Sequence, residues 1–331
     1  MRAILIERPG GPEVLRGHEV PTPQPGRAEV RVRVRATAVN RADLLQRMGR
    51  YPAPADAPRD IPGLEFAGEI DALGEAVTEW KVGDRVFGLA GGGTYAEMVL
   101  AHERGLAAIP GRLSFEAAAA APEAFITAHD ALVTQAGMAG GDRVLVHAAG
   151  SGVGTAAIQL ARALGARPIG TARSAAKLQR VLELELGVAA GDTVLVQQGG
   201  SFADEVLEKT ASRGVDVFLE LVGGDYLAED VRCAAQGARI VLVGMLAGAR
   251  AELDLAAVMQ RRLVIRGTML RSRPLEEKLL AMRVFARHVV PLLDAGTVRP
   301  IVDRTFPLMA ADEAHRYVAS NAGFGKVVLT V

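Results

Sequence analysis

The sequence has a single cysteine, Cys233, among its 331 residues, and only 4% of them are aromatic. One cysteine forms no intramolecular disulfide and supplies no cysteine-rich zinc site. No apolar run approaches the roughly 20 residues needed to cross a bilayer, and Glu7 and Arg8 interrupt the first strand-like pattern before a signal-type segment develops. These absences predict a soluble, cytoplasmic protein with no membrane partner.

Neither sign of charge dominates, because 38 Lys and Arg residues balance 38 Asp and Glu residues. Nucleic-acid-binding proteins usually carry a basic surplus or stripe. The local series Arg31, Arg33 and Arg35 alternates with valines, as the solvated face of a half-buried strand does. We therefore expect no nucleic-acid partner.

The patterning changes near residue 117. Before it, short strands lie between Gly- and Pro-rich turns, which indicates a β-rich domain. After it, helix and strand periods alternate, which predicts an α/β fold with a doubly wound parallel sheet. The expected helices are 117–134, 155–164 and 226–235, and the expected strands are 143–147, 168–171, 215–221 and 239–243. After a helix over about 275–295, strand-like pieces in 298–331 predict a return to the first domain.

A turn of small residues follows the strand that ends near His147 and leads directly into a helix. Small side chains let the backbone approach a pyrophosphate, and the N–H groups of the helix start hold its charge. The literal G-x-G-x-x-G pattern is not met, because Ala149 and Ser151 stand in that register. Context favours a cofactor turn over a purely structural one. A second Gly-Asp strand at 191–196 leads to Asp204 and Glu205, which would repel phosphate, so we interpret it as a buried strand.

The region about 20 residues after this turn indicates which nucleotide binds. An NAD site usually offers a carboxylate there. Residues 170–177 contain none, and instead Arg173 and Lys177 could pair with a 2′-phosphate while Ser174 donates a hydrogen bond. The sequence therefore favours NADPH over NADH, the alternative being that both cations are solvated surface residues.

Three long segments, 38–51, 270–273 and 325–329, together with the turn around Ser151, resemble the medium-chain dehydrogenase/reductases. The similarity is to the zinc-free, zeta-crystallin-like quinone oxidoreductases, and most of all to their tumour-suppressor-inducible branch. It implies a GroES-like substrate domain over 1–120, a Rossmann NADPH-binding domain over 121–290, and a C-terminal segment, 291–331, that returns to the first domain. A cleft between the domains and a homodimer joined near Leu263–Thr268 are also implied. The zinc alcohol dehydrogenases have Cys and His where this chain has Asn40 and Leu64.

The resemblance also implies residue roles. Asn40, Asp43 and Tyr51 would be catalytic residues near the nicotinamide, and Thr127 would lie close to its ring. Cofactor contacts are implied for Ser151, Gly152, Val153, Ser174, Lys177, Val222, Gly223, Gly244, Met269, Leu270 and Phe324, and Arg173 joins them on its charge.

Structural roles remain open for the three catalytic candidates. Asn40 could satisfy backbone groups in a turn, Asp43 could cap a helix starting near Leu44, and Tyr51 could anchor a loop. His147 is expected to be a packed, hydrogen-bonded residue without a catalytic role. The chain departs from the family over 181–201, where it is longer and Gln197 replaces a tyrosine that stacks on the cofactor.

The implied activity is NADPH-dependent, zinc-independent hydride transfer to a quinone. Reduction of a 2-alkenal, another enone or an enoyl thioester uses the same hydride geometry and remains an alternative. A protein that binds NADPH with little turnover is the alternative from another class.

Overall fold

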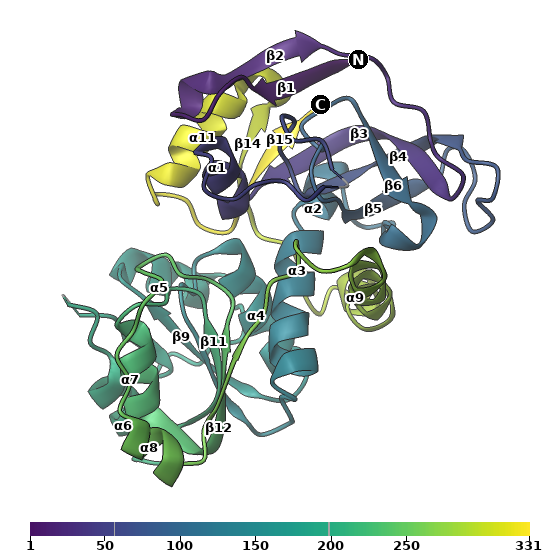
Figure 1. Cartoon of the computed structure of the whole chain (residues 1–331). Helices are drawn as coiled ribbons and strands as arrows, with labels where there is room; N and C mark the ends of the chain where they lie inside the picture. The colour runs from purple at the N-terminus through teal and green to yellow at the C-terminus, as the bar shows by residue number, and fades with distance from the viewer. Residues whose placement is uncertain (56, 198) are drawn as a thin grey trace. The chain divides into compact units, whose positions relative to one another are not determined.

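The computed structural model describes residues 1–55, 57–197 and 199–331. The chain forms two compact units, each treated separately below (Figure 1). Unit 1 comprises Met1–Ile126, Arg271–Gly296 and Pro300–Val331, and unit 2 comprises Thr127–Leu270 and Thr297–Arg299. Among the described residues, no helix is long and apolar enough to span a membrane. The division into a substrate domain and a cofactor domain stays a prediction.

Unit 1 is built on a seven-stranded sheet of order β14-β15-β3-β4-β5-β7, with β6 also paired to β3. Its longest strand, β3, alternates buried valines with the more exposed Arg31, Arg33 and Arg35, which confirms the predicted half-buried strand. The last strand, β15, pairs antiparallel with β3, so the end of the chain completes this sheet. The strands of the sheet are β3 (Glu29–Val39), β4 (Glu65–Leu73), β5 (Arg85–Leu89), β6 (Met98–His102), β7 (Leu106–Ala108), β14 (Val302–Pro307) and β15 (Lys326–Thr330).

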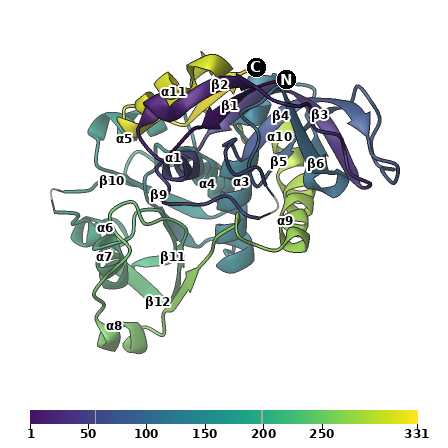
Figure 2. The ribbon, with the colours of Figure 1, turned by 45° about the horizontal axis from the view of Figure 1, so that its top comes forward.

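A separate hairpin of β1 (Arg2–Ile6) and β2 (Leu15–Glu19) lies next to helix α11 (Ala311–Ala319) in both views (Figures 1 and 2). The segment after residue 298 was predicted to contain only strand-like pieces, whereas the structure has the helix α11 there. This helix buries Ala311, Ala314 and His315 on one face, a stripe too short to stand out from its surroundings. The other helices that lie wholly in unit 1 are α1 (Arg41–Arg47), α2 (Phe115–Ala119), α9 (Leu275–His288) and α10 (Val290–Ala295).

Unit 2 is a six-stranded sheet of order β10-β9-β8-β11-β12-β13 in which every pair is parallel. The order reverses between β8 and β11, the point beyond which such sheets bind their ligands. The predicted doubly wound α/β fold is confirmed. The strands are β8 (Arg143–Val146), β9 (Arg167–Ala172), β10 (Thr193–Leu195), β11 (Val215–Glu220), β12 (Ala234–Leu242) and β13 (Val264–Gly267), and the helices that accompany them are α4 (Gly152–Ala163), α5 (Ala175–Glu183), α6 (Ala203–Lys209), α7 (Tyr226–Cys233) and α8 (Leu255–Gln260).

Two predicted helices are divided in the structure, and a third ends earlier than predicted. The helix expected over 117–134 consists of α2, then α3 (Pro122–His129), then a π-helical segment over Asp130–Gln135. Pro122 has no N–H to continue α2 and instead begins α3. The helix expected over 275–295 divides at Val289, just before Pro291. Ala234 and Ala235, predicted as helical, belong to β12.

Candidate functional site

The small-residue turn after β8 leads into α4, as predicted. Ser151 is the N-cap of this helix, and its Oγ accepts a hydrogen bond from the Gly154 N–H at 3.0 Å. The N–H groups of Gly152 and Val153 have no acceptor among the described residues, because the first turn of a helix lacks preceding carbonyls. Two unpaired donors at a helix start fit an anionic ligand such as a pyrophosphate.

Glycine is needed in this turn at position 154. A Cβ there would lie 2.4 Å from the carbonyl oxygen of Ala148, a contact that backbone atoms cannot relieve cheaply. Ala148 itself has a left-handed backbone, with φ of +48°. The small residues of this turn therefore let the start of α4 pack directly against the backbone at the end of β8.

The three residues predicted for the 2′-phosphate follow β9. Arg173 is exposed, and Lys177 lies half-buried in the first turn of α5. Ser174 is the N-cap of α5, but its hydroxyl makes no capping hydrogen bond. The structure thus places two cations and a hydroxyl within five consecutive positions of the chain. No carboxylate stands between Thr171 and Gln179.

The turns after β11 and β12 hold Val222, Gly223 and Gly244. A Cβ on Gly244 would lie 2.4 Å from the Leu221 carbonyl oxygen, and one on Gly223 would lie 2.7 Å from the Gly248 carbonyl oxygen. Backbone packing between these two turns therefore explains both glycines, whether or not a cofactor binds there. Val222 and Gly223 each donate a backbone hydrogen bond to the carboxylate of Glu220.

The remaining predicted contacts lie farther along the chain. Thr127 is half-buried in α3, and Met269 and Leu270 follow β13, with Met269 47% exposed. All three belong to unit 2, whereas Phe324 is buried in unit 1 before β15. Contact of these residues with one nicotinamide stays a prediction.

In unit 1, Asn40 and Asp43 form the start of α1. Asn40 is the N-cap, and the Asp43 Oδ2 accepts a hydrogen bond from its N–H at 2.8 Å, which completes a capping box. The capping role considered for Asp43 is therefore present. Its other oxygen, Oδ1, is buried without a hydrogen-bond partner, and burial raises the pKa of this carboxyl to about 6.

Asn40 also belongs to a buried charge network that the sequence analysis missed. The Lys326 Nζ donates to Asn40 Oδ1 at 2.5 Å and to Glu65 Oε1 at 2.6 Å. Asn40 Nδ2 donates to the same Glu65 oxygen at 2.9 Å, while Glu65 Oε2 accepts from the Glu123 N–H at 2.8 Å. Burial raises the pKa of the Glu123 carboxyl to about 7. The Asn40 amide is thus held by partners from β4 and β15.

This network includes a position where the resemblance to the medium-chain dehydrogenase/reductases implies a zinc ligand in the zinc-dependent enzymes. Of the two positions where those enzymes carry Cys and His, one is an amide hydrogen-bonded to an ammonium group, and the other is Leu64, which has no donor atom. A buried lysine beside Asn40 would repel a divalent cation. The residues present do not fit a catalytic zinc at this position.

Tyr51 lies beside a second missed residue, Arg271. The guanidinium carbon is 5.2 Å from the centre of the Tyr51 ring, and the group also donates to Gln46 Oε1 at 2.6 Å and to the Gly91 carbonyl. Arg271 is only 9% exposed, yet its Nη1 has no hydrogen-bond partner. Burial raises the pKa of Tyr51, so its hydroxyl is neutral at physiological pH and can donate a hydrogen bond.

One sequence signal could have found part of this group. Glu65 interrupts an otherwise apolar stretch from Leu64 to Ala67, where a carboxylate demands a partner. Lys326 and Arg271 lie in segments already noted for their resemblance, but nothing local shows that they are buried.

Comparison with known proteins agrees with both folds. Residues 26–111 match the alcohol dehydrogenase GroES-like domain, and residues 152–286 match the zinc-binding dehydrogenase family. A quinone oxidoreductase of Lama guanicoe is 33% identical over 99% of this chain and 97% of its own length, and one of Pseudomonas aeruginosa is 35% identical over 97% and 96%.

Solved structures give the same picture. An NAD-dependent alcohol dehydrogenase superposes with a TM-score of 0.88 at 35% identity, covering all of both chains. The Escherichia coli quinone oxidoreductase complexed with NADPH superposes with a TM-score of 0.87 at 28% identity, covering all of both chains. The CurK enoyl reductase superposes with a TM-score of 0.86 at 27% identity, covering 99% of this chain and 98% of its own. Because full-length relatives exceed 30% identity, the chain belongs to the medium-chain dehydrogenase/reductase family of oxidoreductases, among relatives of the quinone oxidoreductases.

Proposed function

We propose that this protein is an NADPH-dependent quinone reductase that works without zinc. The observation that carries the proposal is the Asn40–Lys326–Glu65 network, which includes one of the two positions where the family resemblance implies a zinc ligand in the zinc-dependent enzymes. The full-length quinone oxidoreductase relatives support the substrate class. A quinone is already electrophilic, so its reduction needs placement against the nicotinamide and exclusion of water rather than a Lewis acid.

Bound NADPH would supply the hydride. The protein would stabilise the negative charge that develops on the quinone oxygen and deliver a proton to it, giving the hydroquinone. Tyr51 suits this role because burial raises the pKa of its hydroxyl, which stays neutral and can donate a hydrogen bond. The Nη1 of Arg271 is a second donor on the same side of unit 1. The Asn40 amide is already hydrogen-bonded to Glu65 and Lys326, so we assign it a structural role beside the proposed substrate position.

The proposed nucleotide is NADPH rather than NADH. Arg173 and Lys177 provide positive charge for a 2′-phosphate, and the Ser174 hydroxyl is not spent on capping α5. The pyrophosphate would meet the free N–H groups of Gly152 and Val153. The NADPH complex of the E. coli relative supports this choice, although the NAD-dependent relative shows that the family uses both nucleotides.

Reduction of an enone or enoyl thioester is the second candidate. The CurK enoyl reductase supports it, because its fold covers nearly the whole chain. This reaction also needs a proton at the α-carbon, for which Tyr51 or Asp43 would be the donor.

Purified protein mixed with NADPH, or with NADH, tests these candidates through the loss of reduced-nicotinamide absorbance. We expect faster oxidation of NADPH with 1,2-naphthoquinone than with trans-2-alkenals. Activity confined to the alkenals would assign the protein to enone reduction. Tight NADPH binding without turnover of either series would instead indicate a binding protein.

A further inference from the structure

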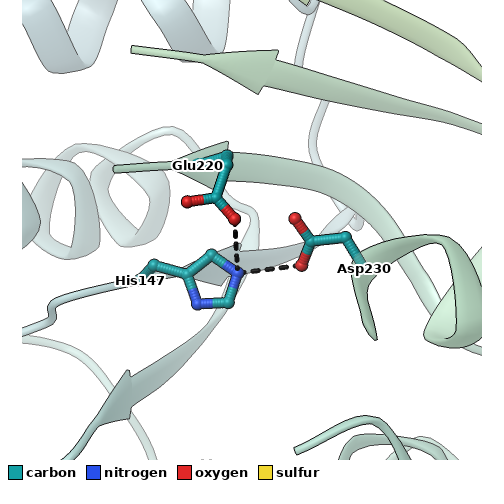
Figure 3. Close-up of side chains that lie close together, drawn as sticks. All are labelled: His147, Glu220 and Asp230. Carbon is teal, nitrogen blue, oxygen red and sulfur yellow. Dashed lines mark hydrogen bonds and ion pairs between the residues drawn. The ribbon is translucent and has the colours of Figure 1, made fainter. Parts of the chain in front are cut away.

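The centre of unit 2 contains a fully buried cluster of three titratable side chains (Figure 3). His147 directly follows β8, Glu220 is the last residue of β11, and Asp230 comes from α7. The His147 Nε2 lies 2.8 Å from Asp230 Oδ1 and 3.6 Å from Glu220 Oε2. The expectation that His147 is packed and hydrogen-bonded is confirmed.

The cluster connects the two central turns of the sheet. The Oε1 of Glu220 accepts the N–H groups of Val222 and Gly223, which fixes the turn after β11. On the other side, the His147 Nδ1 pairs with the Thr171 Oγ1 at 2.8 Å, and the Thr171 carbonyl accepts the Ala149 N–H of the turn after β8. Both turns lie where the strand order reverses, at the carboxyl ends of β8 and β11.

Hydrogen-bond accounting favours an extra proton in the cluster. We assign the imidazole hydrogen to Nε2, which faces two carboxyl groups, and burial lowers the pKa of His147, so the ring is neutral and Nε2 donates to Asp230. Glu220 Oε2 and Asp230 Oδ2 then remain buried without a donor. A proton on one carboxyl group, hydrogen-bonded to the other, satisfies both and removes one of two buried negative charges.

A metal ion is the other occupant to consider, since one nitrogen and two carboxylates form a possible ligand set. A nitrogen and an oxygen bound to one zinc at about 2.0–2.1 Å each lie more than 3 Å apart in tetrahedral geometry. The Nε2–Oδ1 distance of 2.8 Å is instead that of a direct hydrogen bond. The geometry favours a proton.

The surroundings keep water away from the cluster. The rings of Phe202 and Tyr226 stand edge-on to the imidazole, with centres 4.9 and 5.2 Å from it. Among the described residues, the other titratable groups that face the cluster are Tyr226, Glu229 and Cys233, all on α7. Two cations lie beyond them, Arg173 toward Tyr226 and Arg261 toward Cys233, but neither acts on the pKa of Glu220 or Asp230.

We propose that His147, Glu220 and Asp230 are positioning residues that hold the turns after β8 and β11 in place for a nucleotide. A proton shared by the two carboxyl groups keeps these three side chains hydrogen-bonded to one another. This inference rests on the proposed function, because the nucleotide is what the turns would hold. When the proton leaves, two adjacent buried anions repel each other, and Glu220 withdraws from the N–H groups of Val222 and Gly223.

The direction of the pH effect follows from the same groups. Burial raises the pKa of Glu220 to about 7 and that of Asp230 to about 8, above their ordinary values of 4.5 and 3.8. The folded protein therefore binds the proton more tightly than the unfolded chain does. The contribution to stability is complete below about pH 4 and is lost as the pH rises through about 7 to 8.

The test compares Glu220→Gln with Glu220→Ala. Glutamine keeps an oxygen for the two N–H groups and donates to Asp230 without a titrating proton, whereas alanine does neither. Dissociation constants for NADPH and NADH would be measured by calorimetry between about pH 6.5 and about pH 9, with NADH included because a 2′-phosphate titrates near pH 6.

In the wild type we expect the dissociation constant of both nucleotides to rise at least about fivefold across this range. Glu220→Gln should recover most of the affinity lost in Glu220→Ala, which we expect to be about tenfold, and should show no such rise. Asp230→Asn should flatten the profile as well, which guards against misfolding of the alanine variant. Glu205→Gln, on the exposed start of α6, should keep the wild-type profile.

Each contrary result has a distinct meaning. An equal pH slope in wild type and Glu220→Gln would overturn the cluster inference alone. Failure of the wild type to bind either nucleotide would overturn the proposed function and the positioning role with it. One zinc ion per chain in the purified protein, lost in Asp230→Asn, would replace the proton with a metal.

Discussion

At the scale of single residues, several buried side-chain atoms among the described residues have no hydrogen-bond partner. Asp43 Oδ1 and Arg271 Nη1 are both buried without partners, and Tyr51 lies against Arg271. Buried polar atoms without a partner cost about 1–3 kcal/mol each, so folded proteins contain few of them. The unpaired Arg271 Nη1 beside Tyr51 fits the polar substrate that we propose there.

Tyr51→Phe is expected to lower turnover of the quinone by about tenfold or more, because it removes the hydrogen bond to the oxygen that gains charge. The dissociation constant for NADPH should change little. Steady-state kinetics and calorimetry on the same preparation separate the two effects. Tyr317→Phe is the matched control, since Tyr317 bonds to Asp303 on another part of unit 1. Unchanged turnover in Tyr51→Phe would remove this residue from the mechanism.

Lys326→Met is expected to destabilise the protein by about 3–5 kcal/mol, because it leaves the buried Glu65 without a counter-charge. Urea unfolding would measure the loss. Adding Glu65→Gln to this variant should restore much of the stability, since the buried negative charge is then gone. Arg35→Met breaks an exposed pair with Glu69 and should cost no more than about 1 kcal/mol. An equal loss in the free energy of unfolding for Lys326→Met and Arg35→Met would contradict the role of the buried network.

At the scale of elements, the segment from β9 into α5 carries the residues that we propose select NADPH. Arg173 directly follows β9, and Lys177 lies in the first turn of α5. The two cations are therefore four positions apart in the chain, at the start of one helix. The two glycine turns after β11 and β12, by contrast, are explained by mutual packing. Glycine at those positions is weaker evidence for a ligand than charge at the start of α5.

The double variant Arg173→Ala, Lys177→Ala is expected to weaken NADPH binding by about tenfold or more and to leave NADH binding nearly unchanged, because only NADPH carries the 2′-phosphate. The loss should shrink as salt is added. Arg180→Ala, one turn farther along α5, serves as the control for a general change of charge. Equal loss for both nucleotides would show that these cations do not recognise the phosphate.

At the scale of the whole molecule, one edge of the unit 2 sheet has no further strand beside it among the described residues. β13 is the last strand of its sheet, Val264 is 48% exposed, and Met259 on the adjoining α8 is 76% exposed. Exposed edge strands with apolar side chains invite pairing with a second chain. These features support the homodimer proposed from the family resemblance.

Analytical ultracentrifugation is expected to give a mass twice that of one chain. Val264→Lys should shift the protein to monomers, because a lysine on an edge strand opposes pairing. Val82→Lys changes a residue that is 60% exposed elsewhere and should leave the mass unchanged. A monomeric wild type would refute the dimer.

The local sequence was sufficient to predict the features that depend only on residues close together in the chain. The alternation in β3, the parallel strands of unit 2 and the small-residue turn into α4 all follow from periodicity and from side-chain size. The basic residues after β9 were readable for the same reason. The α11 helix and the divided helices were misjudged because short elements carry too few residues for a clear period.

Only the tertiary structure could reveal the buried polar groups. Lys326 meets Glu65 across 261 positions, Arg271 meets Gln46 across 225, and His147 meets Asp230 across 83. No local pattern predicts such pairings. A charged residue is expected to be exposed to solvent, and only the folded chain shows that a distant partner is buried beside it. Periodicity and residue size along the chain were enough to predict the two folds and the small-residue turn into α4, whereas the packing of distant strands sets which titratable groups are buried together.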